Sequence, residues 1–258
     1  MPTLASWSQS FGSEAERYDR ARPPYPAELV DRIVHASPGP DVLDVGCGTG
    51  IAARQLQAAG RTVLGVEPDD RMAAFARHTG VTVETSAFET WDPAGRTFDT
   101  LVAAQSWHWV DAATGPRRAA LVLRPGGLFV ALWHVFAVPD PVSQAFADAF
   151  RRVAPDAPFQ LPASPAQAVA SYEAGCARTA EALLATGAFT GPDRWAADWE
   201  HTYTTAGYLD FMRTTGSLTA LPPDAVDVVV DSVGTAVDAM GGGFTTRHRT
   251  LAVAVVRG

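Results

Sequence analysis

The sequence predicts an α/β fold, with a doubly wound, mostly parallel seven-stranded sheet and a helical cap inserted near the C-terminal half. Short apolar runs rich in β-branched residues alternate with helix-like segments over the first half of the chain. A glycine-rich turn directly follows the first of these runs. From about residue 138 the alternation gives way to longer helical segments. With 258 residues, 47% of them hydrophobic, the composition is that of an ordinary globular chain.

The first half of the chain alternates between expected strands and expected helices. Strands are expected at 42–45, 62–67, 81–85, 98–105 and 127–134. Helices are expected at 52–60, 69–79 and 111–123, and either Asp69 or Asp70 can cap the second of these. Gly126 and Gly127, after Pro125, predict the turn into the next strand.

The second half contains longer helices and two further strands. Residues 139–190 are expected to be helical with prolines in the middle, and 206–240 to hold two more helices. The stretch 194–204 alternates as a strand does, with Trp195, Trp199, His201 and Tyr203 on one face. A last strand is expected at 248–256, after the glycines of 241–243. These two strands are expected to rejoin the sheet, with His201 and His248 facing it.

Charge and composition exclude several classes of protein. With 20 basic and 28 acidic residues the net charge is −8, which disfavours nucleic acid as a partner. Every basic residue is arginine, so neither a Schiff-base lysine nor a P-loop lysine is available. No apolar run approaches ~20 residues, and the start lacks the pattern of a signal peptide. We therefore expect a cytoplasmic protein, away from membranes, with Cys47 and Cys176 reduced.

The stretch VLDVGCGTG (42–50) indicates a ligand site. Its glycines follow a strand, where a parallel sheet binds ligands, and glycine lets the backbone approach a ligand closely. Glu67 ends the next strand, where a carboxylate can accept both hydroxyls of a ribose. Ile51 stands where a dinucleotide motif needs its third glycine, which favours an adenosyl ligand without a pyrophosphate. The alternative is that Glu67 only favours the start of the following helix.

Five motifs appear in one order and spacing along the chain. They are FGSEAERYDRARPPYP (11–26), VLDVGCGTG (42–50), GVEPDDRM (65–72), SAFETWDPAGRTFDTLVAAQSWHWVD (86–111) and LRPGGLFVALWH (123–134). In these motifs the chain resembles the class I S-adenosylmethionine-dependent methyltransferases, which have a Rossmann-like fold. Within them it resembles the small-molecule group that includes trans-aconitate and quinone-pathway methyltransferases.

The resemblance implies a binding site for S-adenosylmethionine. Gly46, Gly48 and Gly50 would admit its methionine and ribose portions, with Cys47 in the same loop. Glu67 would bind the ribose hydroxyls, and Asp44 would act near the ammonium group. Adenine would contact Pro68, Met72, Phe88 and, through the backbone, Ala87. Gln105 would face the methionine portion, and Tyr18, Arg22 and Tyr25 would belong to an N-terminal segment that closes over the cofactor.

The acceptor is expected to be a small molecule, methylated at a hydroxyl or carboxylate oxygen. A hydroxyl needs a base, and His108 follows the fourth strand, where the methyl should emerge; His134 is the second choice, and a purely structural histidine is the alternative. The rings of Trp107, Trp109, Trp133 and Tyr18 can face the sulfonium. No metal site is expected. Two other classes stay open: an NAD-binding oxidoreductase and a non-catalytic cofactor-binding regulator.

The expected organisation is one methyltransferase domain over residues 1–258. Residues 1–36 would form an N-terminal lid and the first helices, and the lid would order when cofactor binds. Residues 139–190 and 206–240 would form a helical cap over the substrate pocket. Arginines of this cap can hold a carboxylate or simply be solvated: Arg151, Arg152, Arg178 and Arg213.

Overall fold

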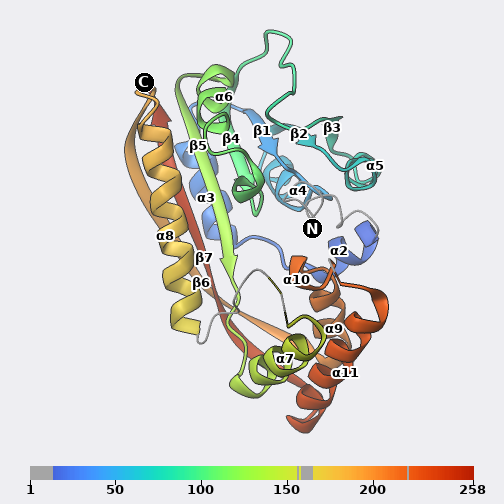
Figure 1. The fold of residues 1–258 in the computed structure, drawn as a ribbon. Helices are drawn as coiled ribbons and strands as arrows, with labels where there is room; N and C mark the ends of the chain where they lie inside the picture. The colour runs from blue at the N-terminus through green and yellow to red at the C-terminus, as the bar shows by residue number, and fades with distance from the viewer. Residues whose placement is uncertain (1–13, 156, 158–164, 220) are drawn as a thin grey trace. The chain divides into compact units, whose positions relative to one another are not determined.

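A computed structural model describes residues 14–155, 157, 165–219 and 221–258 (Figure 1). Expectations about residues 1–13, including the start of the lid, lie outside this range. The chain divides into two compact units. The sheet unit comprises Pro24–His134, Ser171–Ala197 and Thr250–Gly258, and the helical unit comprises the described residues within Met1–Pro23, Val135–Ala170 and Asp198–Arg249.

The described residues form a seven-stranded mixed sheet with the order β3-β2-β1-β4-β5-β7-β6. The strand pairs β1/β2, β2/β3, β1/β4 and β4/β5 are parallel. The strands are β1 (Asp41–Val45), β2 (Thr62–Glu67), β3 (Thr82–Thr85), β4 (Phe98–Ala104), β5 (Leu123–Val135), β6 (Phe189–Thr204) and β7 (Gly243–Arg257). All seven expected strands are therefore present, and the last two rejoin the sheet as expected.

The strand order places a topological switch point at the carboxyl ends of β1 and β4. From β1 the chain goes outward to β2 and β3, and it then returns to β4 on the other side of β1. Ligands of open α/β sheets bind at such a crevice. The register pairs Asp44 of β1 with Gly65 of β2 and with Val102 of β4, so Asp44 lies beside this point.

The helices of the sheet unit include the three that the alternation predicts, which are α4 (Ile51–Ala58), α5 (Asp70–His78) and α6 (Gly115–Val122). The sheet unit also contains α3 (Ala27–Ala36), the short 3₁₀ helix η2 (Trp107–Trp109) and the greater part of α8 (Pro165–Leu184). Leu29, Val30 and Ile33 of α3 are buried in the core that covers the sheet. Asp69 is the N-cap of α5, and its carboxylate accepts hydrogen bonds from the N–H groups of Arg71 and Met72.

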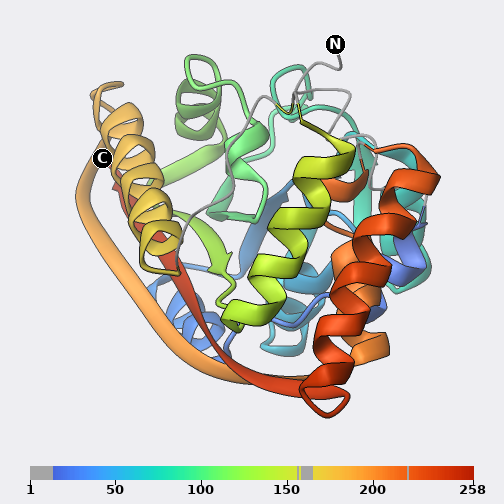
Figure 2. The ribbon, with the colours of Figure 1, turned by 60° about the horizontal axis from the view of Figure 1, so that its bottom comes forward.

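The helical unit has its own hydrophobic core. Its helices are α2 (Ala15–Ala21), α7 (Asp140–Val153), α9 (Thr205–Arg213), α10 (Gly216–Thr219) and α11 (Pro223–Ala239). Figure 2 shows α7 and α11 side by side, and α11 also packs on α9. Phe150, Phe211 and Val233 are buried at these contacts. Helices thus lie in both segments expected to form the cap, but most of α8 belongs to the sheet unit, and the helical expectation for 139–190 is wrong at its end, where β6 begins at Phe189. The covering of a substrate pocket by these helices stays a prediction.

No helix in the described part of the chain is long and apolar enough to cross a membrane. Both cysteines are buried free thiols.

Candidate cofactor-binding site

The glycine-rich loop connects β1 to α4 through three left-handed residues. Gly46, Gly48 and Gly50 have φ angles of 65°, 56° and 87°. The Gly46 N–H donates to the Val66 carbonyl of β2 at 2.8 Å, and the Gly50 N–H donates to the Cys47 carbonyl at 2.9 Å. Because residues with a Cβ disfavour this region by about 1–2 kcal/mol, the backbone favours glycine at each position.

The three glycines differ in what faces them. A Cβ on Gly46 would lie 2.5 Å from the Ser106 Cβ, and a Cβ on Gly50 would lie 2.9 Å from Val81. A Cβ on Gly48 would meet no atom within 4 Å. Packing therefore requires the first and third glycines, whereas the second borders open space that a ligand can fill.

Asp44 of β1 is a fully buried carboxylate whose two oxygens accept no hydrogen bond from any described residue. Burial, followed by the negative charge of Glu67, raises the pKa of Asp44 to about 7. The backbone N–H of Ala53 opposes this shift, but it makes no hydrogen bond of good geometry to the carboxylate. The Thr49 hydroxyl, in the same loop, is also buried without a described partner. Such groups are costly unless a ligand or water satisfies them, so they fit a polar ligand at this loop.

Glu67, at the end of β2, is fixed by two backbone amides. One carboxylate oxygen accepts from the Gly48 N–H and the other from the Asp69 N–H, both at 2.9 Å. Burial raises the pKa of Glu67 to about 7, and these two N–H groups oppose the shift. Asp69 caps α5, so Glu67 is not the capping residue. Each carboxylate oxygen keeps a lone pair that can accept from a ligand hydroxyl.

The residues expected near adenine follow the ends of β2 and β3. The β2/β3 register pairs Glu67 with Thr85, and the Ser86 N–H donates to the Glu67 carbonyl at 3.1 Å. Ala87 and Phe88 therefore come directly after the strand end beside Glu67. The carbonyl of Ala87 accepts from the Trp91 N–H at 2.9 Å, and the Phe88 side chain is buried.

Pro68 and Met72 lie at the start of the next helical segment. Pro68 is half-buried just after Glu67. Met72, in the first turn of α5, is buried, and its N–H donates to the Asp69 carboxylate at 3.1 Å. Pro68 thus belongs to the β2–α5 connection and Met72 to the helix that follows it, and Glu67 ties this connection to the glycine loop.

Cys47 has a packing role that the sequence did not indicate. A Cβ on Gly65 would lie 2.5 Å from the Cys47 Sγ, so the thiol occupies the space that Gly65 leaves open on β2. Burial raises the pKa of the Cys47 thiol well above its usual value. Its side chain belongs to the core, and the predicted cofactor contact of Cys47 can only come from its backbone.

Gln105 holds a strained backbone at the end of β4. Its φ of 59° is unusual for a residue with a side chain. Its N–H donates to the Leu132 carbonyl at 2.9 Å, and its amide nitrogen donates to the His134 carbonyl at 3.3 Å. The neighbouring Ser106 hydroxyl donates to the Val45 carbonyl and so joins β4 to β1. Sequence reasoning missed Ser106, because a serine after a strand is common and only its contact with Gly46 distinguishes it.

Trp107 belongs to a packed aromatic cluster. It is buried, its ring meets the Phe129 ring edge-on at 4.7 Å, and the Phe88 ring lies 6.2 Å away. These contacts suit a side chain that supports the loop. Contact of Trp107 with a sulfonium stays a prediction.

His108 lies in η2 with an exposed side chain, and its Nδ1 accepts a hydrogen bond from the Trp133 indole N–H at 3.3 Å. Desolvation by the surrounding residues lowers the pKa of His108 to about 4, so the ring is neutral at pH 7 and is a weaker base than a free imidazole. A neutral ring that accepts at Nδ1 has its proton on Nε2. To act as a base, His108 must therefore lose the hydrogen bond from Trp133, so that its Nδ1 can accept a proton from the substrate.

His134 is built into the sheet unit. It is buried on β5, and its Nδ1 lies 2.8 Å from the Thr250 hydroxyl. Its ring stacks on Tyr25 with centroids 4.5 Å apart. Tyr25 is itself held to α4, because its N–H donates to the Gln55 side chain at 2.9 Å and its carbonyl accepts from it at 2.8 Å. These contacts give His134 a structural role.

Tyr18 and Arg22 lie in the helical unit, on α2 and just after it. The Arg22 guanidinium is 4.8 Å from the centre of the Tyr18 ring and 5.0 Å from that of Phe211. It also donates to the hydroxyl and carbonyl oxygens of Thr214, at 2.9 and 2.6 Å. Arg22 thus joins α2 to α9, and a contact of either residue with the cofactor stays a prediction.

Within the residues that the structure describes, no three His, Cys, Asp or Glu side chains gather as metal ligands would.

Comparison with known proteins identifies the segment that holds this site. Residues 42–127 match a family described as a methyltransferase domain. An uncharacterized methyltransferase of Mycobacterium tuberculosis (strain H37Rv) is 37% identical over 131 residues, which are 49% of this chain and 53% of that protein. A ubiquinone biosynthesis O-methyltransferase of Bradyrhizobium diazoefficiens is 33% identical over 106 residues, 38% of this chain and 42% of that protein. The chain thus spans about half the length of the curated relatives it matches.

Solved structures show the same fold. A proposed type II methyltransferase from Anaeromyxobacter dehalogenans has a TM-score of 0.59 at 23% identity, covering 92% of this chain and 97% of that one. A phosphoethanolamine N-methyltransferase from Haemonchus contortus, in complex with phosphomonomethylethanolamine and S-adenosylhomocysteine, has a TM-score of 0.55 at 15% identity, covering 100% of this chain and 60% of that one. The fold is that of the class I methyltransferases.

Residues 42–127 therefore match a methyltransferase domain, and the relatives that share this segment are named as methyltransferases. Asp44, Gly48 and Glu67 all lie within it. The open space at Gly48 and the unsatisfied carboxylate of Asp44 fit a cofactor with hydroxyl and ammonium donors.

Proposed function

We propose that the whole chain is an enzyme that transfers a methyl group from S-adenosylmethionine to a small molecule. The acceptor atom is the oxygen of a hydroxyl or of a carboxylate. The observation that supports this most is the pair of buried carboxylates, Asp44 and Glu67, at the ends of the two strands next to the glycine loop. Glu67 accepts from the Gly48 N–H, and a Cβ on Gly48 would meet no atom within 4 Å. A small polar molecule with several donors and little negative charge suits such a place. Two buried carboxylates disfavour the pyrophosphate of a dinucleotide.

In this proposal the loop binds the cofactor along its length. Glu67 accepts the ribose hydroxyls with the lone pairs that its two amide contacts leave. Asp44 pairs with the ammonium group, directly or through water. Further contacts come from Gly46, Gly50, the Cys47 backbone, Gln105 and the adenine-side residues Pro68, Met72, Ala87 and Phe88.

The bound cofactor would supply a methyl group on a positively charged sulfur. The chain's own contribution is then to position the acceptor and to exclude water, since positive charge disappears as the methyl moves. For a hydroxyl acceptor, the Nδ1 of His108 would take the proton after it leaves Trp133. A carboxylate acceptor is already ionised and needs no base. The predicted lid and cap would close the site.

A small-molecule acceptor agrees with the charge of the chain and with the names of its relatives. The net charge of −8 repels nucleic acid. The relatives that match at 33–37% identity include enzymes named for ubiquinone O-methylation, which favours an oxygen acceptor.

The test is turnover. The protein is incubated with S-adenosylmethionine and separate pools of phenols, aliphatic alcohols, carboxylic acids, amines and RNA, and S-adenosylhomocysteine and methylated products are measured by mass spectrometry. We expect product from a phenol, alcohol or carboxylic acid pool, and none from RNA. Methylation of RNA alone would overturn the substrate class. Cofactor binding without turnover in any pool would favour a regulator, and hydride transfer with NAD would favour an oxidoreductase.

A further inference from the structure

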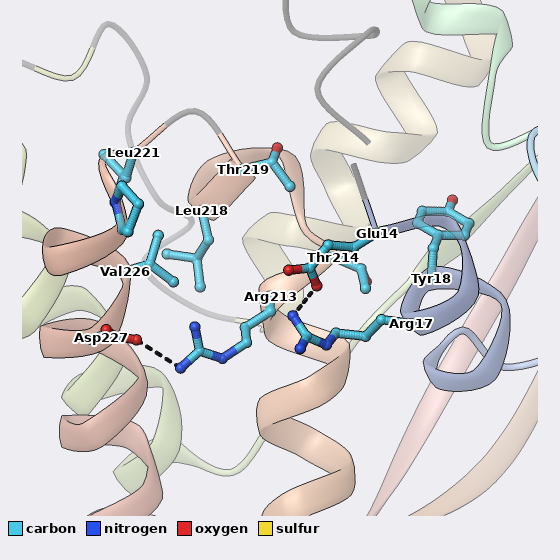
Figure 3. Close-up of a pocket in the computed structure, with 11 residues that line it drawn as sticks. Glu14, Arg17, Tyr18, Arg213, Thr214, Leu218, Thr219, Leu221, Val226 and Asp227 are labelled. Atoms are coloured by element: carbon cyan, nitrogen blue, oxygen red, sulfur yellow. Dashed lines mark hydrogen bonds and ion pairs between the residues drawn. The ribbon is translucent and has the colours of Figure 1, made fainter. Parts of the chain in front are cut away.

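The helical unit contains a pocket that uses no residue of the glycine loop (Figure 3). It has a volume of about 330 Å³ and lies between α2, the end of α9, α10 and the start of α11. Nothing in the methyltransferase assignment gives this pocket a ligand.

One wall of the pocket is apolar. Leu218 of α10 is fully buried, and Val226 and Pro223 of α11 continue the same wall. Aliphatic side chains around a cavity of this size suit the hydrocarbon body of a small molecule. Apolar contact alone selects no particular ligand, so the polar groups must decide its chemistry.

Two arginines line the same pocket, and each has an acidic partner at the rim. Arg17 pairs with Glu14, and Arg213 donates to the Asp227 carboxylate at 2.8 Å (Figure 3). The side chains of Arg17 and Arg213 are 32% and 31% exposed, whereas those of Glu14 and Asp227 are 47% and 59% exposed. In both pairs the arginine is thus the more enclosed member.

This asymmetry decides which partner a ligand can replace. An exposed ion pair contributes only ~0–1 kcal/mol. The side chain of Glu14 or Asp227 can therefore rotate away from its arginine into the solvent at little cost. A half-enclosed guanidinium left without an acceptor is less favourable. Arg17 has a second acidic partner, because its Nε forms an ion pair with Asp210 at 3.3 Å, although without good hydrogen-bond geometry. Arg213 is thus the arginine whose acidic partner a ligand replaces most readily. A carboxylate of a ligand can therefore replace Glu14 or Asp227 as the partner of an arginine in the pocket.

We propose that this pocket binds a small carboxylic acid with an apolar body. Its carboxylate pairs with Arg213 or Arg17 in place of the rim acid, since guanidinium and carboxylate form charge-assisted and often bidentate hydrogen bonds. Its hydrocarbon body lies against Leu218, Pro223 and Val226. Binding needs neither S-adenosylmethionine nor methyl transfer, so its failure would leave the proposed enzymatic function untouched.

Binding is measured by titration calorimetry on the full chain, without cofactor, using octanoate and 4-phenylbutyrate as probes. Octanamide and inorganic phosphate serve as controls, because the first lacks the charge and the second lacks the apolar body. We expect saturable binding of the two acids, at least about tenfold weaker binding of octanamide, and no measurable binding of phosphate. No saturable binding of either acid, or equal binding of octanamide, overturns the proposal.

Variants test the residues. Arg213→Gln should weaken octanoate binding about tenfold, whereas Asp227→Asn, which removes the competing acid, should strengthen it about threefold. Val226→Trp should block the pocket without changing its charge. Arg151→Gln is the matched control, since Arg151 is an exposed arginine of the same unit that pairs with Asp148. Thermal unfolding confirms that each variant folds. Unchanged binding in Arg213→Gln and Val226→Trp would place the acids elsewhere and contradict the assignment.

Discussion

Replacing Gly48 with alanine should separate ligand binding from backbone strain, and Gly60 provides the matched control. Both glycines are left-handed, with φ of 56° and 83°, and a Cβ on either would meet no atom within 4 Å. Gly60 follows α4 and lies outside the loop. The two substitutions therefore cost the same backbone strain, about 1–2 kcal/mol, without a steric clash in the protein.

The two variants should differ only in cofactor binding. Each should lower the apparent unfolding temperature by about 2–8 °C, as expected for a chain of this size. Gly48→Ala should also weaken S-adenosylmethionine binding at least about tenfold, or 1.4 kcal/mol, because its methyl group projects into the proposed cofactor space. Calorimetric titration measures the affinity, and differential scanning calorimetry measures the unfolding temperature. Wild-type affinity in Gly48→Ala would refute the placement of the cofactor at this loop.

Four further predictions concern the same domain and its helical neighbour. Glu67→Ala should weaken cofactor binding about tenfold through loss of a charged acceptor, measured by the same titration. The raised pKa of Asp44 means that the folded protein keeps a proton between about pH 4 and 7 that the unfolded chain releases. Stability of the cofactor-free protein should therefore fall as pH rises through that window, and Asp44→Asn should flatten the fall in denaturant titrations; an unchanged slope would count against the shift. If a hydroxyl is methylated, His108→Ala should lower kcat about a hundredfold with little change in cofactor affinity, whereas near-normal turnover would indicate a carboxylate acceptor. Arg22→Lys should lower the unfolding temperature, because lysine cannot keep both bonds to Thr214; lost cofactor affinity at unchanged stability would instead support the predicted contact.

Local patterns in the sequence predict most of the sheet unit. The apolar runs before Glu67 and before Gln105 end at the strand ends that they indicate, because a buried parallel strand needs a continuous apolar run. Asp69 was one of two candidate caps, and its position before the first helical turn is the one that satisfies two amides. The glycine spacing likewise marks the sharp turn between β1 and α4.

Features that depend on contacts between distant residues could not be predicted. The Cys47 thiol packs over Gly65, and no local pattern pairs a cysteine with a glycine on the next strand. β5 begins at Leu123 and includes Gly126, and its register against β4 shifts between Phe98 and Thr100. The sequence instead predicts a turn at Gly126 and Gly127, because adjacent glycines after a proline are typical of turns. The pocket between Arg17 and Arg213 exists because α2 packs on α9, which only tertiary structure brings about.

The most direct measurement of the central claim is a calorimetric titration of the unmodified protein with S-adenosylmethionine, S-adenosylhomocysteine and NAD. The titration is run above pH 7, where Asp44 and Glu67 are ionised and can accept hydrogen bonds from a ligand. Both adenosyl compounds should then bind at one site per chain and compete with each other. NAD should not bind, because a third glycine is missing and its pyrophosphate would approach two buried carboxylates. Saturable binding of NAD, with no heat from either adenosyl compound, would contradict the account.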